Sequence, residues 1–106
     1  QGLIEAIALP QLEIFEGAMK FLQNEGLVPA PEPSHAIAGA IREALAAKEA
    51  GEKRVILFNL CGHGHFDMAA YDAYLSGNLH NYVYPQESIE SALAKLPDVK
   101  DPTAAT

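Results

Sequence analysis

The chain has 106 residues, of which 49% are hydrophobic and 20% are charged, which is typical of one small globular domain rather than a disordered segment. Fourteen acidic residues against seven basic ones give a net charge of −7, so the surface repels phosphate backbones and nucleic acid is excluded as a partner. No apolar run approaches the roughly 20 residues of a bilayer-spanning helix. Because Cys61 is the single cysteine, it cannot form an internal disulfide, and we expect a cytoplasmic protein without membrane contact.

The first two predicted elements are a strand and a helix. Residues 3–9 are a short apolar run that predicts a buried strand, which Pro10 closes. In residues 11–24 apolar residues recur at three- and four-residue steps, which predicts a helix that stops at Glu25-Gly26. The apolar positions of this helix are Leu12, Phe15, Met19 and Leu22.

A proline-rich connection leads to the second predicted helix. The prolines of residues 28–33 predict an extended, irregular connection. Ser34 then has the residue type of an N-cap, and Gly51 that of a C-terminal stop, for a helix over residues 34–50. Its predicted buried stripe consists of Ile37, Ile41 and Leu45.

The strongest strand signal lies at residues 54–60, a nearly continuous apolar run of the kind that is buried on both faces of a parallel sheet. The predicted elements that follow are a tight loop (61–65), a short helix (66–75), an irregular aromatic stretch (78–85), an amphipathic helix (87–96) with Ile89 and Leu93 inside, and a flexible tail (98–106).

This order of elements predicts an α/β fold with a partial parallel sheet of about two strands, flanked by about four helices. We expect one domain over residues 1–97. Two strands leave apolar faces and open edges, so we expect the sheet to be part of a larger one, or else one half of a sheet shared between two chains.

A candidate ligand site lies where the second predicted strand meets the next helix, over residues 58–67. Ligands of parallel α/β sheets bind beyond the carboxyl ends of the strands. Gly62 and Gly64 would let the backbone turn sharply and approach a ligand closely, and the free amides of the following helix favour an anion or a polar ring atom. The alternative is a simple turn, because strand-to-helix loops often contain glycine.

A second candidate segment is Pro29-Ala30-Pro31-Glu32-Pro33-Ser34-His35. Its prolines would hold the Glu32 carboxylate in place just before a helix, where the helix dipole stabilises the charged form. The alternative is a solvated loop in which Glu32 only compensates that dipole.

These two segments resemble tryptophan synthase β chains. Residues 25–37, EGLVPAPEPSHAI, resemble the EGI-PA-E-SHA segment of that family, and residues 59–64, NLCGHG, resemble its NLSGRG loop. The likeness is greater to the divergent second type of β chain, in which a GHG loop leads into an Asp-containing helix, as in residues 65–71. The resemblance runs over residues 3–96 and implies a fragment of the three-layer α/β fold of enzymes that use pyridoxal 5′-phosphate (PLP).

The resemblance also implies roles for individual residues. Cys61 stands where the family has the serine that contacts the pyridine nitrogen of PLP, and a thiol is likewise a neutral partner. Such a partner leaves that nitrogen largely unprotonated, which suits β-elimination and replacement. The alternative is a Cys61 that only packs in the protein interior. Glu32 is expected to face the cofactor ring.

The other implied site residues surround these two. Gly62 and Gly64 are expected to shape the loop under the ring, and His63 stands where better-known β chains have arginine. Ser34 and His35 match the family's SHA motif and are expected to contact substrate or shape the loop.

The family's Schiff-base lysine, phosphate-binding loop and catalytic carboxylate lie in earlier parts of its chains. None of Lys20, Lys48, Lys53, Lys95 and Lys100 has the required sequence context. The first residues also lack a Met and the basic start of a signal peptide, which predicts a chain cut from a longer one. We therefore expect no catalytic residue here, no activity or PLP binding by the chain alone, and two partners: the amino-terminal remainder of the enzyme and a second copy in a homodimer. The implied reaction joins L-serine and indole into L-tryptophan by β-replacement.

Two further hypotheses remain open. His63 and His65, with Asp67 or His35 nearby, could form a metal-binding module, although a His-x-His pair alone is a weak signal. The chain could also be a free-standing interaction domain that dimerises to complete its own sheet.

Overall fold

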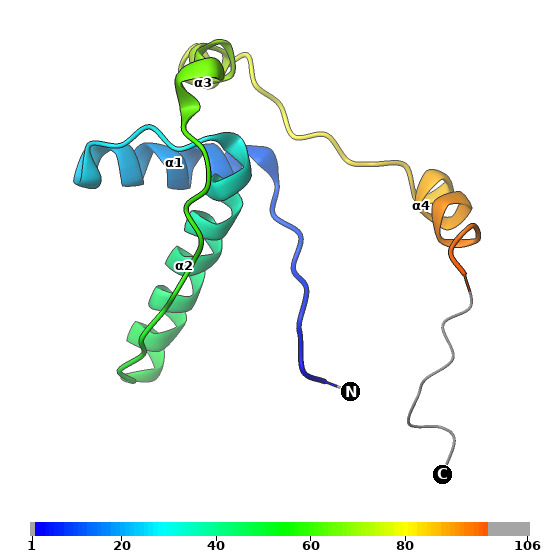
Figure 1. Cartoon of the computed structure of the whole chain (residues 1–106), viewed down its shortest axis with the longest axis horizontal. Helices are drawn as coiled ribbons and strands as arrows, with labels where there is room; N and C mark the ends of the chain where they lie inside the picture. Colours follow the sequence, from blue (N-terminus) through cyan, green and yellow to red (C-terminus); the bar gives the residue numbers. More distant parts are fainter. Residues whose placement is uncertain (1, 98–106) are drawn as a thin grey trace.

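The computed structural model describes residues 2–97. Its elements are the helices α1 (Gln11–Glu25), α2 (Pro31–Ala50), α3 (Met68–Leu75) and α4 (Gln86–Leu93), with one turn of 3₁₀-helix, η1 (Gly64–Phe66). Figure 1 shows α1 crossing the upper part of α2, α3 above both helices, and α4 well separated from all three. The predicted tail, residues 98–106, lies outside the described residues.

The core lies between α1 and α2, with α3 closing one side. Ile14, Phe15, Ala18 and Ala38 are at most 4% exposed. Gly17 faces Ala38 where the two helices meet, and a Cβ atom built on Gly17 would lie 3.4 Å from the Ala38 backbone and side chain, at van der Waals contact. At the edge of this contact Arg42 donates two hydrogen bonds to the Glu13 carboxylate, of 2.6 and 2.7 Å.

The predicted helix over residues 11–24 is confirmed by α1, which ends at Gly26 with a positive φ of 71°. The second helix is confirmed over residues 34–50, but it begins earlier, at Pro31. Ser34 is therefore not its N-cap, and the Ser34 hydroxyl donates to Ala30 O from within the first turn, at 2.7 Å. Proline is tolerated in a first turn, where the missing N–H has no helical partner.

The predicted α/β fold with a partial parallel sheet is wrong, because the described part of the chain contains helices and no strand. Residues 3–9 and 54–60 are extended, yet they form no ladder of hydrogen bonds. Val55 is 102% exposed and Leu57 95%, so the predicted burial on both faces is also wrong. An extended segment becomes a strand only through a hydrogen-bonded neighbour, and neither segment has one in the described residues.

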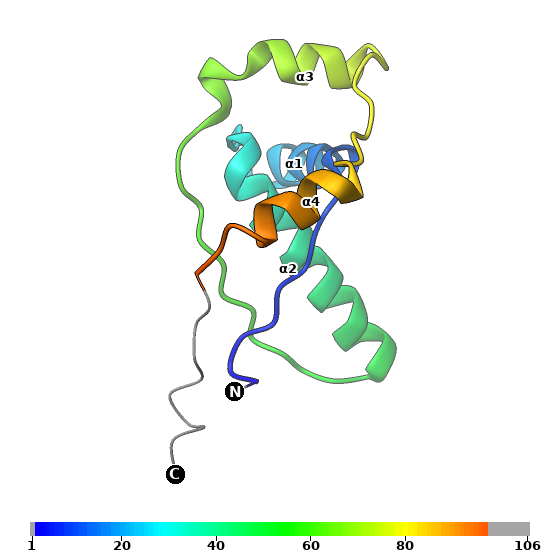
Figure 2. The same cartoon turned by 90° about the vertical axis from the view of Figure 1, so that its right-hand side faces the viewer.

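Residues 54–60 nevertheless have one covered face. Ile56 and Phe58 line an open apolar groove with Ile37 and Ile41 of α2, and the Phe58 ring meets Phe21 of α1 edge-on, with centroids 6.3 Å apart. Figure 2 shows this segment returning from the far end of α2 towards α3. Side chains alternate in extended backbone, so Val55 and Leu57 point away from the helices.

The segment that follows α3 is joined to the start of α1 by two hydrogen bonds. The Gln11 side-chain amide donates to His80 O, and the Asn81 side-chain oxygen accepts a hydrogen bond from Leu12 N at 3.0 Å. Beyond it, α4 buries no residue, and Leu93, which we predicted to lie inside, is 58% exposed. The radius of gyration is 17.6 Å, against about 13 Å for a compact domain of about this length. Within the described range no helix has the length and apolarity to cross a bilayer.

Candidate functional site

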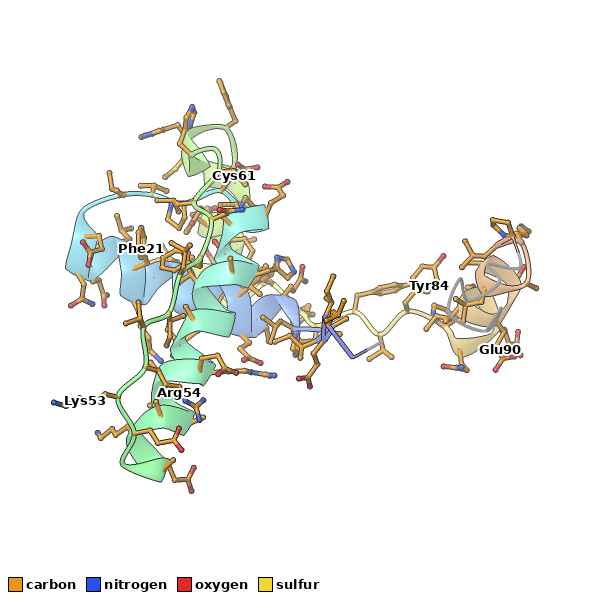
Figure 3. All side chains as sticks on the ribbon, turned by 60° about the horizontal axis from the view of Figure 1, so that its bottom comes forward. Phe21, Lys53, Arg54, Cys61, Tyr84 and Glu90 are labelled. Carbon is orange, nitrogen blue, oxygen red and sulfur yellow. The ribbon has the colours of Figure 1, made fainter. Side chains whose placement is uncertain are left out.

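The two candidate segments lie against each other. Gly64 N donates to Val28 O at 2.8 Å, and a Cβ atom built on Gly62 would lie 3.5 Å from the Ala30 side chain. The glycine loop therefore passes directly beside the residues that lead into α2. Figure 3 shows Cys61 on this loop near the amino-terminal end of α2.

Because Gly64 has no side chain, the loop can lie close to residues 28–30. Gly64 is buried, and a Cβ atom built on it would lie 2.5 Å from Pro29 O, 2.7 Å from Val28 Cγ1 and 3.0 Å from Tyr71 Cε2. Real Cβ atoms do not approach a carbonyl oxygen this closely, so any other residue would push the loop away. Gly62 has a φ of +69°, a conformation that other residues rarely adopt.

Three consecutive carbonyl groups of the segment before α2 are each hydrogen-bonded to a different part of the chain. Val28 O accepts from the loop, Pro29 O accepts from the Tyr71 hydroxyl at 2.5 Å, and Ala30 O accepts from Ser34 at 2.7 Å. Pro29 and Ser34 are fully buried. The segment is thus fixed from the loop, from α3 and from α2 at once.

The predicted site residues differ in exposure. The Cys61 thiol is free and exposed, and Glu32 lies exposed in the first turn of α2, two residues beyond Ala30. His35 is also exposed, and its Nδ1 lies 3.1 Å from Pro31 O. Ser34 is buried and hydrogen-bonded to the backbone, so in this structure it shapes the segment and does not face solvent.

The histidines of the loop form a small aromatic group. The His63 and His65 ring centroids are 4.9 Å apart, His63 Nδ1 accepts from His65 N at 3.3 Å, and the Phe66 ring lies 5.2 Å from His63. In residues 2–97 no three His, Cys, Asp or Glu side chains gather as a metal site would require. Asp67 and His35 therefore do not complete a ligand set with the histidine pair.

A pocket of about 170 Å³ opens beside the loop. It is lined by the two histidines, by Leu60 and Gly62, and by the segment before α2: Gly26, Leu27, Val28 and Pro29. Neither Cys61 nor Glu32 is among its lining residues. Two of the predicted site residues, Gly62 and His63, do line this pocket.

The chemistry of these residues is compatible with the predicted wall of a PLP site. The exposed thiol of Cys61 is a neutral hydrogen-bonding group of the kind that a ring nitrogen can accept, and Glu32 is an exposed carboxylate close in sequence to the buried segment. Among the described lysines, Lys20 is paired with Glu16 at 2.6 Å on α1, and Lys48, Lys53 and Lys95 lie at exposed positions on or near helix ends.

The site residue that the sequence did not reveal is Tyr71. The apolar spacing of α3 indicates only that Met68, Tyr71 and Leu75 can share one face, and of these Tyr71 is 3% exposed whereas Met68 and Leu75 are 53% and 67% exposed. The Tyr71 hydroxyl contacts Pro29, which is 42 residues away in the chain. Burial raises the pKa of the Tyr71 hydroxyl. A tyrosine at a predicted core position needs a hydrogen-bond partner, and this was the available signal.

Comparison with known proteins gives one consistent answer, although no family model matches the chain. Residues of this chain are 62% identical over 79 residues to tryptophan synthase beta chain 2 of Methanosarcina mazei, covering 74% of this chain and 18% of that protein. The protein of the same name from Aquifex aeolicus is 60% identical over 78 residues. Tryptophan synthase beta chain of Pseudothermotoga lettingae is 62% identical over 71 residues. The chain spans about a fifth (18%) of the length of the first two relatives.

Proposed function

Because this chain is homologous to the carboxy-terminal part of the tryptophan synthase β chains, we propose that it forms one wall of the PLP site in an enzyme that makes L-tryptophan from L-serine and indole. PLP supplies the electron-withdrawing ring that β-replacement needs. A related β-replacement or dehydration is the alternative, because the residues of this wall do not contact the acceptor substrate.

The observation that carries the proposal is the contact between the two family motifs. The hydrogen bond from Gly64 N to Val28 O, at 2.8 Å, joins the loop that holds Cys61 to the segment that leads to Glu32. The two motifs, residues 25–37 and 59–64, are separated by the 21 residues 38–58 in sequence and are brought together by this contact. A binding wall needs such an arrangement, whereas a simple turn and a solvated loop do not.

Each residue has a proposed task. Cys61 offers its neutral thiol to the pyridine nitrogen, and Glu32 lies beside the ring and influences its charge state. Gly62 and Gly64 keep the loop flat and close to the segment before α2. His63 and His35 border the wall, and Ser34 holds the segment in place through Ala30 O.

The chain is proposed to be inactive alone and to bind PLP only together with the rest of the β chain. A covalent PLP mechanism needs a lysine against the cofactor aldehyde, and the described lysines lie on exposed surfaces. The remaining four-fifths of the enzyme would supply that lysine and the phosphate-binding loop. We also expect the complete enzyme to be a homodimer.

The test is a chimera in which this chain replaces the homologous segment of the Methanosarcina mazei β chain. We expect the chimera to bind PLP and form tryptophan from serine and indole, while this chain alone does neither. Cys61→Ala and Glu32→Ala should each lower the rate of tryptophan formation, and Cys61→Ser, which restores the family residue, should retain it. A folded chimera that binds no PLP would contradict the proposal, and one that binds PLP but consumes serine without indole would favour dehydration.

A further inference from the structure

Tyr71 contacts both segments of the candidate site, at Pro29 and at Gly64. Its hydroxyl donates to Pro29 O at 2.5 Å, and its ring edge lies 3.0 Å from the position that a Cβ atom on Gly64 would occupy. The opposite side of the ring meets Phe15 of α1 edge-on, with centroids 5.1 Å apart. One side chain of α3 thus lies against the loop, the segment before α2 and the core helix.

The hydroxyl of Tyr71 is the polar part of this contact. Tyr71 is 3% exposed, and Pro29 is fully buried, so water has little access to the hydrogen bond between them. A buried carbonyl that loses its donor keeps the cost of desolvation. Removing only the oxygen of Tyr71 would therefore leave Pro29 O unsatisfied and free the segment to move relative to the loop.

Loss of this hydrogen bond would affect the two exposed residues that we propose to lie beside the cofactor, Cys61 and Glu32. Cys61 lies three residues before Gly64, and Glu32 lies three residues after Pro29. Each is joined by a short stretch of backbone to an atom that Tyr71 touches. The contacts of Tyr71 therefore act together with the Gly64 N to Val28 O hydrogen bond to fix the thiol relative to the carboxylate.

We propose that Tyr71 is a positioning residue of the PLP wall, which fixes the loop that holds Cys61 against the segment that leads to Glu32. This role rests on the function proposed above and assigns a task to Tyr71, for which the resemblance to the family implied none. Tyr71 lies behind the wall and does not contact the cofactor itself.

Tyr74 provides a matched control on the same helix. Its ring also packs on Phe15, stacked at 5.6 Å between centroids, and it is only half-buried. Within residues 2–97 its hydroxyl contacts no part of the loop or of the segment before α2 by hydrogen bond. Removing that hydroxyl should therefore leave the wall unchanged.

The experiment measures PLP affinity and the absorbance spectrum of bound PLP in the chimera with Tyr71→Phe, Tyr74→Phe or Phe15→Leu. For Tyr71→Phe we expect PLP binding to weaken roughly three- to tenfold, the effect of one lost buried hydrogen bond, together with a shifted absorbance band. Tyr74→Phe should change neither quantity. Phe15→Leu loosens the core behind the ring but keeps the hydroxyl, so it should lower the unfolding temperature more than it lowers PLP affinity.

The outcomes separate this role from the proposed function. If the unsubstituted chimera binds no PLP, the proposed function fails and this role fails with it. If that chimera binds PLP and Tyr71→Phe binds it equally well, only the role of Tyr71 is overturned. The role is also overturned if Tyr71→Phe and Phe15→Leu lose affinity in equal proportion to their loss of unfolding temperature, or if Tyr71→Phe fails to fold, because the hydroxyl would then be a general folding contact.

Discussion

Two regions of this chain obtain their contacts in different ways. The packed body, which consists of α1, α2, α3 and residues 61–64, satisfies its buried side-chain polar atoms and covers its apolar core from within the described chain. The uncovered segments, residues 3–9, 54–60 and 78–93, carry many large apolar side chains that remain exposed, such as Ile4 at 92% and Val83 at 85%. The candidate site lies at the edge of the packed body, so its backbone is fixed even though neighbouring segments are not covered.

This difference shows which contacts a chain homologous to the carboxy-terminal part of a larger protein can form by itself. Core residues pack when their contact partners lie in the same chain, as the Phe15 ring packs against Tyr71. Apolar residues without a packing partner among residues 2–97, such as Val55 and Leu57, stay exposed on extended backbone. Exposed apolar area of this extent normally marks a surface that another polypeptide covers.

The sharpest contrast between the two regions is between two phenylalanines. Phe15 is 4% exposed and Phe66 is 91% exposed. We expect Phe15→Ala to lower the free energy of unfolding of the chain by about 3–5 kcal/mol, and Phe66→Ala by less than about 0.5 kcal/mol. Urea unfolding followed by circular dichroism measures both, and equal losses would mean that the packed body does not exist as described.

A second contrast concerns two glycines. Gly64→Ala places a Cβ atom 2.5 Å from Pro29 O, whereas Gly39→Ala in α2 meets nothing within 4 Å. We expect the first to cost about 1–3 kcal/mol of unfolding free energy through overpacking, and the second to stabilise the chain by roughly 0.5–1 kcal/mol because alanine favours helix. The same unfolding measurement applies, and a neutral Gly64→Ala would show that the loop is not held against residues 28–30.

The point where the two regions join gives a smaller effect. Asn81 accepts from Leu12 N at 3.0 Å and so serves as the side-chain cap that Pro10 does not provide. We expect Asn81→Ala to cost about 1 kcal/mol, as for other lost caps, and to speed amide hydrogen exchange in residues 78–85. The neighbouring change Tyr82→Ala, at a position 74% exposed, is the control and should leave the exchange at Leu12 unchanged.

The smallest expected effect is that of an exposed ion pair. The hydrogen bonds from Arg42 lower the pKa of the Glu13 carboxyl below its usual value. A carboxyl whose pKa is lower in the folded chain stabilises the fold above its unfolded pKa, and this contribution disappears as the pH falls through the folded pKa. Thermal unfolding of the chain and of Glu13→Gln should therefore differ slightly at neutral pH and converge in acid; a difference that grows on acidification would contradict this assignment.

The sequence predicted the helices well and the extended segments poorly, for one physical reason. Residues 11–24 and 34–50 form helices because their hydrogen bonds are local and their caps, Gly26 and Gly51, are next to them. Residues 54–60 have an apolar pattern equally suited to a buried strand, but a strand needs a neighbour, and sequence cannot reveal whether that neighbour is present.

The sequence predicted the two segments of the candidate site, but it did not predict the contacts that join them. The resemblance identified the loop and the proline-rich segment, and they do lie together. The hydroxyl of Tyr71 was missed because no local pattern predicts a hydrogen bond across 42 residues. Likewise, Ser34 was predicted as a cap because of its residue type, whereas the prolines before it had already begun the helix.

The close approach of Gly64 to residues 28–30 has a consequence for how this site can change over evolutionary time or by design. A backbone hydrogen bond from the amide of Gly64 holds the loop in place. The side chain of Cys61, three residues earlier, is exposed and takes no part in this hydrogen bond. The identity of residue 61 can therefore drift, as from serine to cysteine, without refolding the loop. Variant libraries that test the proposed role of residue 61 should therefore vary this residue before the glycines beside it, because its side chain can change while the backbone contact is kept.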